Sequence, residues 1–215
     1  MHATSLFTLT SALAGLTAAA PSPNNNLSAS KGIKLRVHLI DATKDLPKPV
    51  SNLYITSIHD GAGLNSVGFS DQGRTFYING TGSDGLFWRT LSDGGSPSSP
   101  YGLALHYNKD TPDVQGVRLD GGPGDSDIYV PAAGYDKPEL IPYGWMACDE
   151  PLAYYGGTHF NILQRNAFQG AIPKECVSVK LLPECTDLPA TPPGALANHD
   201  HAIVVSCYKD ASKAE

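Results

Sequence analysis

Short β-forming segments separated by turn residues are the feature of this sequence that most restricts its fold. Ile33–Ile40 begins with the alternation of apolar and polar residues typical of a half-buried strand, and Leu53–Ile58 is rich in β-formers. Further strands are expected at 66–70, 75–79, 86–90, 101–107, 114–119, 127–130, 143–149, 159–165, 177–182 and 202–208. Turn-forming residues separate nearly all of them, and no window of about twelve residues keeps a helical period. The pattern predicts an all-β protein, an antiparallel sandwich or closed barrel of about 10–12 strands, with a β-trefoil as the alternative.

The first residues of the chain have the composition of a secretory signal. Residues 1–20 contain no Lys, Arg, Asp or Glu, and the apolar run Leu6–Ala19 ends in small residues. This predicts a signal peptide over 1–19, a disordered leader over 20–32 and a secreted protein, extracellular or in the cell wall. Because no later apolar stretch approaches about 18 residues, we expect no membrane contact.

Charge and missing motifs exclude several classes of function. The net charge is −6 and the sequence has no basic block, which argues against a nucleic-acid partner. The sequence has no nucleophile elbow, no zinc-protease motif and no glycine-rich nucleotide-binding loop. These absences favour a protein that is not an enzyme, although two carboxylates distant in sequence can still meet in space.

Four cysteines, Cys148, Cys176, Cys185 and Cys207, lie in the last third of the chain. An even number in an exported protein predicts two disulfides. The strand expected between Cys176 and Cys185 spans about 20 Å, whereas a disulfide needs Cα atoms within about 6 Å. That pair is therefore disfavoured together with its complement, and of the other connectivities we favour Cys148–Cys176 with Cys185–Cys207. Zinc binding would need closer pairs.

Three motifs carry a resemblance to a known family. They are Leu53–Asn65 (LYITSIHDGAGLN), Tyr143–Asp149 (YGWMACD) and Ile172–Leu181 (IPKECVSVKL). In this order they resemble a family of small secreted fungal proteins known only as a domain of unknown function. The resemblance implies a disulfide between Cys148 and Cys176, and it implies no activity. It covers residues 33–182, the expected β domain, so that 183–215 is predicted to be a C-terminal extension with a last strand.

The most distinctive polar cluster is His59-Asp60-Gly61-Ala62-Gly63-Leu64-Asn65. In a catalytic interpretation, His59 is a general base oriented by Asp60 or Asp71. In a binding interpretation, His59 and Asn65 hold a polyol such as a sugar. In a structural interpretation, Asp60-Gly61 starts a tight turn and Asn65 caps backbone groups.

Aromatic residues supply the other half of the predicted binding site. Tyr154 and Tyr155 are adjacent and precede two glycines, so that both are expected to be exposed on a turn. Aromatic rings in β proteins are first of all core residues, but an exposed pair can stack on a sugar. The predicted ligand-binding residues are therefore Tyr154, Tyr155, His59 and Asn65.

Two segments raise the question of a metal, and two triplets predict glycosylation. Asp120, Asp125 and Asp127 make a carboxylate-rich loop that could hold Ca²⁺ without matching the EF-hand order. His199 and His201 would share one face of a strand. Neither segment supplies a complete ligand set, so we expect no metal or other cofactor, with calcium as the alternative. Asn26 and Asn79 fit the N-glycosylation pattern.

The function that these features favour is a secreted, non-catalytic β-module that binds a glycan, a cell-wall polysaccharide or a host protein. One alternative is a small secreted hydrolase that uses His59 and a carboxylate. A second alternative is a structural wall or matrix protein without a defined ligand. The sequence contains no signal for an oligomeric state.

Overall fold

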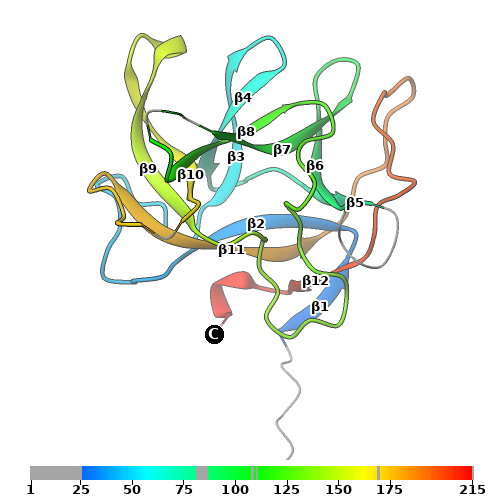
Figure 1. The fold of residues 1–215 in the computed structure, drawn as a ribbon. Coiled ribbons are helices and arrows are strands. Elements are labelled where there is room, and N and C mark those ends of the chain that lie inside the picture. The colour runs from blue at the N-terminus through cyan, green and yellow to red at the C-terminus, as the bar shows by residue number, and fades with distance from the viewer. Residues whose placement is uncertain (1–25, 81–86, 108, 110, 169, 215) are drawn as a thin grey trace, which may run out of the picture.

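Twelve strands and two short 3-10 helices make up the part of the chain that the structure describes (Figure 1). This computed structural model describes residues 26–214 apart from 81–86, 108, 110 and 169. The strands are β1 (Leu27–Ser30), β2 (Gly32–Leu39), β3 (Tyr54–Gly61), β4 (Leu64–Ser70), β5 (Tyr77–Asn79), β6 (Arg89–Gly94), β7 (Ser99–Tyr107), β8 (Val114–Gly121), β9 (Trp145–Leu152), β10 (Thr158–Asn166), β11 (Cys176–Thr186) and β12 (Val205–Tyr208). The helices are η1 (Ala153–Tyr155) and η2 (Ala211–Lys213), and within these residues neither could cross a membrane. The predicted all-β class is confirmed.

All twelve strands are hydrogen-bonded into one sheet. Strands β2, β3, β4, β10, β9 and β11 pair in a closed ring, because β11 pairs with both β9 and β2. Strands β5 to β8 pair in chain order as a meander, which joins the ring where β8 pairs with β4 and β10. A trefoil needs three equivalent units, and a four-strand meander followed by a hairpin does not supply them. The closed ring agrees with the barrel form of the prediction.

The alternation read in the second strand places its apolar residues inside the ring. Ile33, Leu35, Val37 and Leu39 are all buried, while the residues between them face outward. Leu181 on the neighbouring β11 is fully buried in the same core. Because side chains of a strand alternate between the two faces, this one strand defines the inner and outer surface of the ring.

Both ends of the described chain are more ordered than the sequence predicts. Leu27–Ser30 forms β1 and pairs with β12, so the prediction of a disordered leader is corrected over residues 27–32 (Figure 1). Residues 20–25 and the predicted signal peptide lie outside the described residues. Strand β11 crosses the predicted boundary at 182 and continues to Thr186, because β2 supplies pairing partners for β11 from Val179 to Thr186. Residues 183–214 are therefore part of the domain.

Glu184 attaches the last residues of the chain to the barrel. Its carboxylate accepts hydrogen bonds from Tyr54 Oη at 2.5 Å, from Ala211 N–H at 2.8 Å and from Arg36 Nη1 at 3.1 Å. Burial, reinforced by the Glu184 carboxylate, raises the pKa of Tyr54 to about 12. The predicted extension is held by part-buried polar contacts as well as by strand pairing.

Both favoured disulfides are present. Cys148 and Cys176 face each other across β9 and β11 with Cα atoms 4.0 Å apart, and Cys185 and Cys207 join β11 to β12 with Cα atoms 5.2 Å apart. The first bond joins the start of β11 to β9, and the second joins the end of β11 to β12. The second bond fixes the segment that the sequence treats as an extension.

Two local predictions need correction. Residues 127–130 form only isolated bridges, Arg89 with Ile128 and Tyr129 with Ile141, although Ile128 and Val130 are buried as in a strand. The predicted turn at His59–Gly63 begins later, since β3 continues to Gly61. Asn79 ends β5 with its side-chain oxygen buried, and residues 81–86 after it lie outside the described part of the chain.

Candidate functional site

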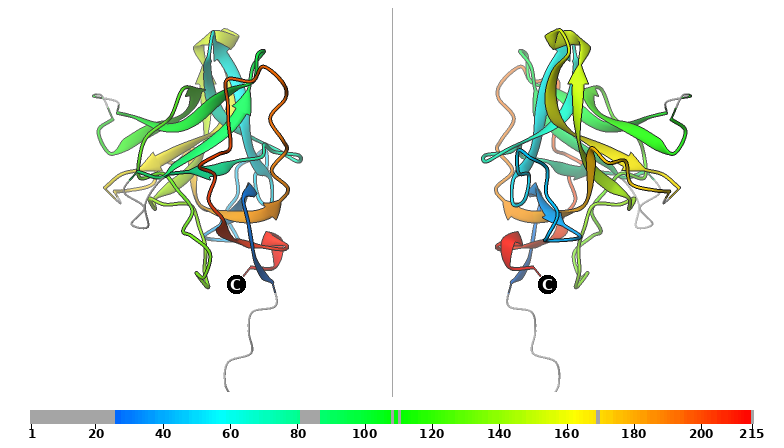
Figure 2. Two further views of the ribbon diagram at one scale, coloured as in Figure 1. Left: turned by 90° about the vertical axis from the view of Figure 1, so that its right-hand side faces the viewer. Right: turned by 90° about the vertical axis from the view of Figure 1, so that its left-hand side faces the viewer.

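The tips of the β3–β4 and β9–β10 hairpins lie side by side at the upper end of the molecule (Figure 2). Helix η1 carries Tyr154 and Tyr155 at the tip of the second hairpin. Gly156 and Gly157 follow with φ of 64° and 84°, a backbone region that glycine adopts without strain. These glycines close the turn directly behind the tyrosines and hold both rings at the tip.

Four rings form a continuous row across the two tips, which we call the aromatic ridge: His59, Tyr154, Tyr155 and Phe160. The ring centroids of His59 and Tyr154 are 5.5 Å apart, those of Tyr154 and Tyr155 are 5.3 Å apart, and those of Tyr155 and Phe160 are 4.8 Å apart. Neighbouring rings are steeply inclined, as aromatic pairs prefer. The structure therefore brings together three of the four predicted ligand-binding residues.

The ridge combines a fixed base with an exposed crest. The hydroxyl of Tyr155 donates to the carbonyl oxygen of His59 at 2.7 Å and ties the two hairpins together. Tyr154 is 58% exposed and Tyr155 is 38% exposed, and Leu64 in the tip of the β3–β4 hairpin is 46% exposed. Exposed large apolar side chains that gather at one place are typical of a binding surface.

Asn65, the fourth predicted residue, does not belong to the ridge. Its side chain is buried and donates from Nδ2 to the carbonyl oxygen of Leu119 at 2.7 Å, and its backbone N–H donates to Asp120 at 2.8 Å. This is the structural interpretation of the residue, because a buried amide must satisfy its hydrogen bonds within the protein. Asn65 joins β4 to β8 beneath the tip.

Asp60 does not orient His59. Its carboxylate accepts two hydrogen bonds from Arg118, both at 2.7 Å, and one from Ser66 at 2.7 Å. Asp71 follows the opposite end of β4, so neither aspartate completes the predicted His–Asp pair. Burial raises the pKa of Asp60, but the Arg118 and Ser66 hydrogen bonds outweigh it and hold this pKa below its usual range. Asp60 is therefore an ion-pair partner of Arg118, and no hydrogen bond joins its carboxylate to His59 within the described residues.

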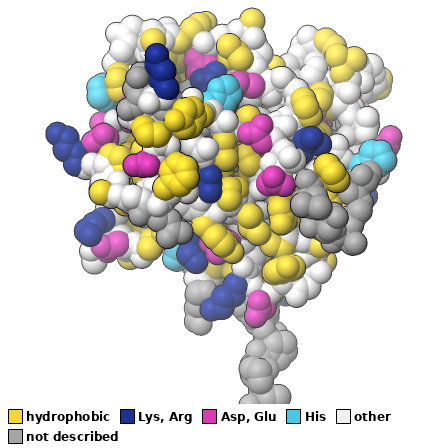
Figure 3. Space-filling view, viewed as in Figure 1, with side chains coloured by type: hydrophobic (Ala, Val, Ile, Leu, Met, Phe, Trp, Pro, Cys, Tyr) yellow, Lys and Arg dark blue, Asp and Glu magenta, His cyan; other side chains and the backbone are white. Residues whose placement is uncertain are grey.

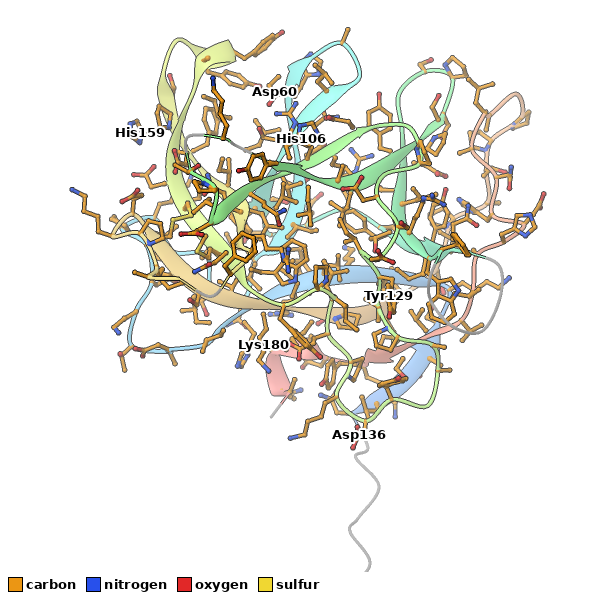
Figure 4. The ribbon with its side chains drawn as sticks, in the orientation of Figure 1. Asp60, His106, Tyr129, Asp136, His159 and Lys180 are labelled. Carbon is orange, nitrogen blue, oxygen red and sulfur yellow. A yellow bond between two sulfur atoms is a disulfide. The ribbon has the colours of Figure 1, made fainter. Side chains whose placement is uncertain are left out.

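Charged groups on the rest of this face are mixed in sign. His106 lies on β7, whereas His159 projects from the outer side of the β9–β10 hairpin in Figure 4. His106 Nε2 lies 4.0 Å from Asp120, and His159 Nδ1 lies 3.2 Å from Asp149. Figure 3 shows acidic and basic side chains interspersed over the face, with no large area of one sign.

The acidic loop does not gather its carboxylates. Asp120 lies 3.4 Å from Arg118, and Asp125 accepts the backbone N–H of Leu105 at 2.7 Å. Asp127 occupies a positive φ of 75° on the exposed part of the loop. Within the described residues, no three His, Cys, Asp or Glu side chains come together as metal ligands. The arrangement gives the calcium alternative no support.

The two histidines near the C-terminus also separate. His199 Nε2 lies 2.9 Å from Asp93, which accepts the Tyr77 hydroxyl at 3.2 Å, and the rings of His199 and Tyr77 are 4.5 Å apart. His201 is exposed in a turn, so the strand geometry expected for a shared metal is not found. Burial, together with Asp93, raises the pKa of Tyr77. Tyr77 and Asp93 line a cleft of about 360 Å³ together with residues of the 188–192 segment.

The two predicted glycosylation sites differ in their surroundings. Asn26 Nδ2 donates to the carbonyl oxygen of Asp210 at 2.8 Å, which holds the start of β1 against the C-terminal turn. Asn79 lies at the end of β5 with its Oδ1 buried. Both asparagines are part-buried, and Thr81 of the second triplet lies outside the described residues.

Sequence reasoning missed Phe160 and Arg118. Phe160 lies opposite Glu150 in the β9–β10 register, and its ring contacts the ring of Tyr155. Because side chains two residues apart share one face of a strand, the spacing of Phe160 from Thr158 was the available signal. Arg118 meets Asp60 across 58 residues of sequence, and no local pattern indicates that pairing.

Comparison with known proteins places this architecture in a family. Residues 30–185 match the model of a family described as a domain of unknown function (DUF7907). The chain is 37% identical over 196 residues to the antigenic protein SchS34 of Stachybotrys chartarum, a match that covers 86% of this chain and 89% of that protein. No solved structure matches the chain. The family resemblance read from the three motifs is thus confirmed: this chain belongs to the fungal family of the domain of unknown function DUF7907.

Proposed function

We propose that this protein is a secreted module that binds a glycan through the aromatic ridge. The observation that carries the proposal is the convergence of His59, Tyr154 and Tyr155 from two hairpins into one exposed row. Two disulfides and an apolar N-terminal run of signal-peptide length support secretion. A related protein named for its antigenicity is compatible with an extracellular location.

The chemistry of the ridge suits a sugar ring. A pyranose has an apolar C–H face that loses unfavourable hydration against an aromatic ring, and hydroxyls around its edge. Tyr154 offers an exposed ring, and among the described residues no group bonds to its hydroxyl. The Tyr155 hydroxyl donates its hydrogen bond to the His59 carbonyl oxygen, so this residue stabilises the shape of the ridge.

The ridge contains no carboxylate and no Lys or Arg side chain. Its selectivity must therefore come from ring stacking and neutral hydrogen bonds, which favours an uncharged sugar over a charged one. The predicted hydrolase is not part of the proposal, because the carboxylate beside His59 in the sequence is bonded to Arg118 and Ser66.

A glycan and polysaccharide array with the mature, disulfide-bonded protein tests the proposal, with bound protein and released sugar both recorded. Tyr154→Ala is expected to weaken retention by roughly tenfold or more, because an exposed aromatic anchor contributes most at a small interface. Tyr107→Ala is the matched control, since Tyr107 is 66% exposed on β7 outside the ridge. Tyr155→Phe keeps the ring and removes the hydroxyl that joins the hairpins.

Tyr154→Ala and its control Tyr107→Ala separate the possible failures. Retention that Tyr154→Ala leaves unchanged would remove the ridge from the binding site. Equal loss in Tyr107→Ala would indicate nonspecific adhesion. Release of sugar from the array would show turnover and overturn the non-catalytic part of the proposal.

A further inference from the structure

A concave surface lies well away from the ridge, between the β5–β8 meander and the segment that follows β8. It is a hollow of about 610 Å³, in the usual size range of ligand sites. Arg89 from β6, Gln115 from β8, Arg165 from β10 and Asp125, Asp127 and Pro142 from the connecting segment line it. That segment runs down the front of the molecule in Figure 1. Thr158 at the ridge and Arg165 are separated by about 23 Å along β10.

The wall that carries the aspartates is held by a close backbone contact. A Cβ atom on Gly102 would lie 2.2 Å from the backbone nitrogen of Gly124, so β7 and the loop can approach only because Gly102 has no side chain. Gly124 adopts a φ of 66° at the same contact. The hollow is therefore bounded on this side by a fixed loop.

Arg89 is an unusual residue within this hollow. Its Nε is buried and has no hydrogen-bond partner among the described residues. No carboxylate in that part of the chain lies within ion-pair distance of its guanidinium. Because this guanidinium lines the hollow without a counter-ion, a ligand that supplies acceptor oxygens there would be favoured.

Arg165 faces the same hollow and also lacks a counter-ion within the described chain. Its Nε donates to the Tyr143 carbonyl oxygen at 2.9 Å and its Nη1 to Gln115 Oε1 at 2.7 Å, both neutral acceptors. Burial lowers the pKa of Arg165, and no carboxylate offsets that effect. Two guanidinium groups thus enter one hollow without an ion pair.

The carboxylates on the facing loop are separate from the guanidinium groups. Asp125 uses only Oδ2, which accepts the Leu105 N–H at 2.7 Å, and Asp127 lies exposed on the loop. Neither lies within 4.0 Å of Arg89 or Arg165. The hollow therefore offers donors and acceptors that do not satisfy one another.

We infer that this hollow binds a sugar acid, a ring that carries one carboxylate and several hydroxyls. A guanidinium only donates hydrogen bonds and pairs well with a carboxylate, while an aspartate only accepts. A hydroxyl does both, so a polyhydroxylated ring can bridge the two kinds of group in the hollow. This site goes beyond the proposed function, and neither site requires the other.

The test is an NMR titration of the full disulfide-bonded protein with sodium galacturonate, compared with galactose and acetate at equal ionic strength. Galacturonate is expected to shift the side-chain amide of Gln115 and the backbone amides of Gly124 and Ser126, and to leave Tyr154 and Tyr155 unchanged. Arg89→Gln and Arg165→Gln should each weaken binding by roughly tenfold or more. Lys44→Gln is the control, because it removes one positive charge from an exposed side chain outside the hollow.

A third variant keeps the test decisive if the arginine variants do not fold. Ser126→Trp adds bulk from the loop that lines the hollow and should abolish the shifts while the fold persists. Equal shifts with galactose would overturn the role of the carboxylate, and equal shifts with acetate would overturn the role of the sugar ring. Equal weakening by Lys44→Gln would show nonspecific attraction. Galacturonate shifts at Tyr154 with none in the hollow would transfer the sugar acid to the ridge and refute this site.

Discussion

Arg118 and Arg165 stand on neighbouring strands of one sheet, and their surroundings are opposite. Arg118 lies between Asp60 at 2.7 Å and Asp120 at 3.4 Å. Arg165 bonds only to a backbone carbonyl and to the amide oxygen of Gln115. Burial lowers the pKa of both guanidinium groups, but at Arg118 the aspartates outweigh burial and raise it.

The difference separates residues that hold the fold from residues available to a ligand. A part-buried cation that is saturated by carboxylates has little left to offer a partner, and its loss exposes two buried anions. A cation that bonds to neutral acceptors keeps its charge uncompensated and gains from a bound anion. Identical side chains on adjacent strands are therefore assigned different roles by their partners.

The largest expected effect follows from removing the saturated cation. Arg118→Gln leaves the carboxylates of Asp60 and Asp120 without their main partner, and their side chains are only 10% and 19% exposed. The free energy of unfolding is expected to fall by about 3 kcal/mol, measured by denaturant titration with the disulfides intact. A fall no larger than that of Arg165→Gln would break the comparison.

The pH dependence of stability tests the same ion pair without removing the Arg118 side chain. Because the folded-state pKa of Asp60 is lowered, its contribution is present above the unfolded-state value of about 4 and is lost as the pH falls through the folded-state pKa. Asp60→Asn cannot lose this contribution on acidification. The stability difference between the parent protein and Asp60→Asn should therefore narrow as the pH falls below about 4. A difference that stays constant from pH 6 to pH 2.5 would show that the Asp60 charge contributes nothing.

The sequence was sufficient for features with a local cause. Alternation in Ile33–Leu39 indicated β2, and the spacing of the four cysteines disfavoured one of their three connectivities, the observed pairing being the favoured one of the other two. It was misleading at 127–130, where Ile128 and Val130 are buried by packing and not by strand pairing. The strand predicted at 177–182 ends before Pro183, where the alternation of the sequence ends. In the structure β11 continues, and Pro183 pairs with Leu35 of β2.

The candidate site was only half predictable, for the same reason. His59, Tyr154 and Tyr155 stand out individually, because each lies beside glycines. Their meeting depends on two hairpins 96 residues apart, and the contact from Tyr155 to His59 has no local signature. Likewise, nothing near Arg89 in the sequence indicates Arg165. Whether a charged residue is paired is a property of the folded chain.

The smallest expected effect is the sharpest test of the comparison. Arg89→Met replaces a part-buried guanidinium that has no ion pair within the described residues by an apolar side chain of similar length. Such a change removes an uncompensated charge and keeps most of the packing, so the free energy of unfolding should stay within about 0.5 kcal/mol of the parent value or rise. The measurement is a denaturant titration run beside Arg118→Gln, which loses the same formal charge. A loss at Arg89 as large as that at Arg118 would mean that Arg89 also holds the fold. The inference that the hollow binds a ligand would then lose its main physical argument, because the Arg89 guanidinium would already stabilise the fold.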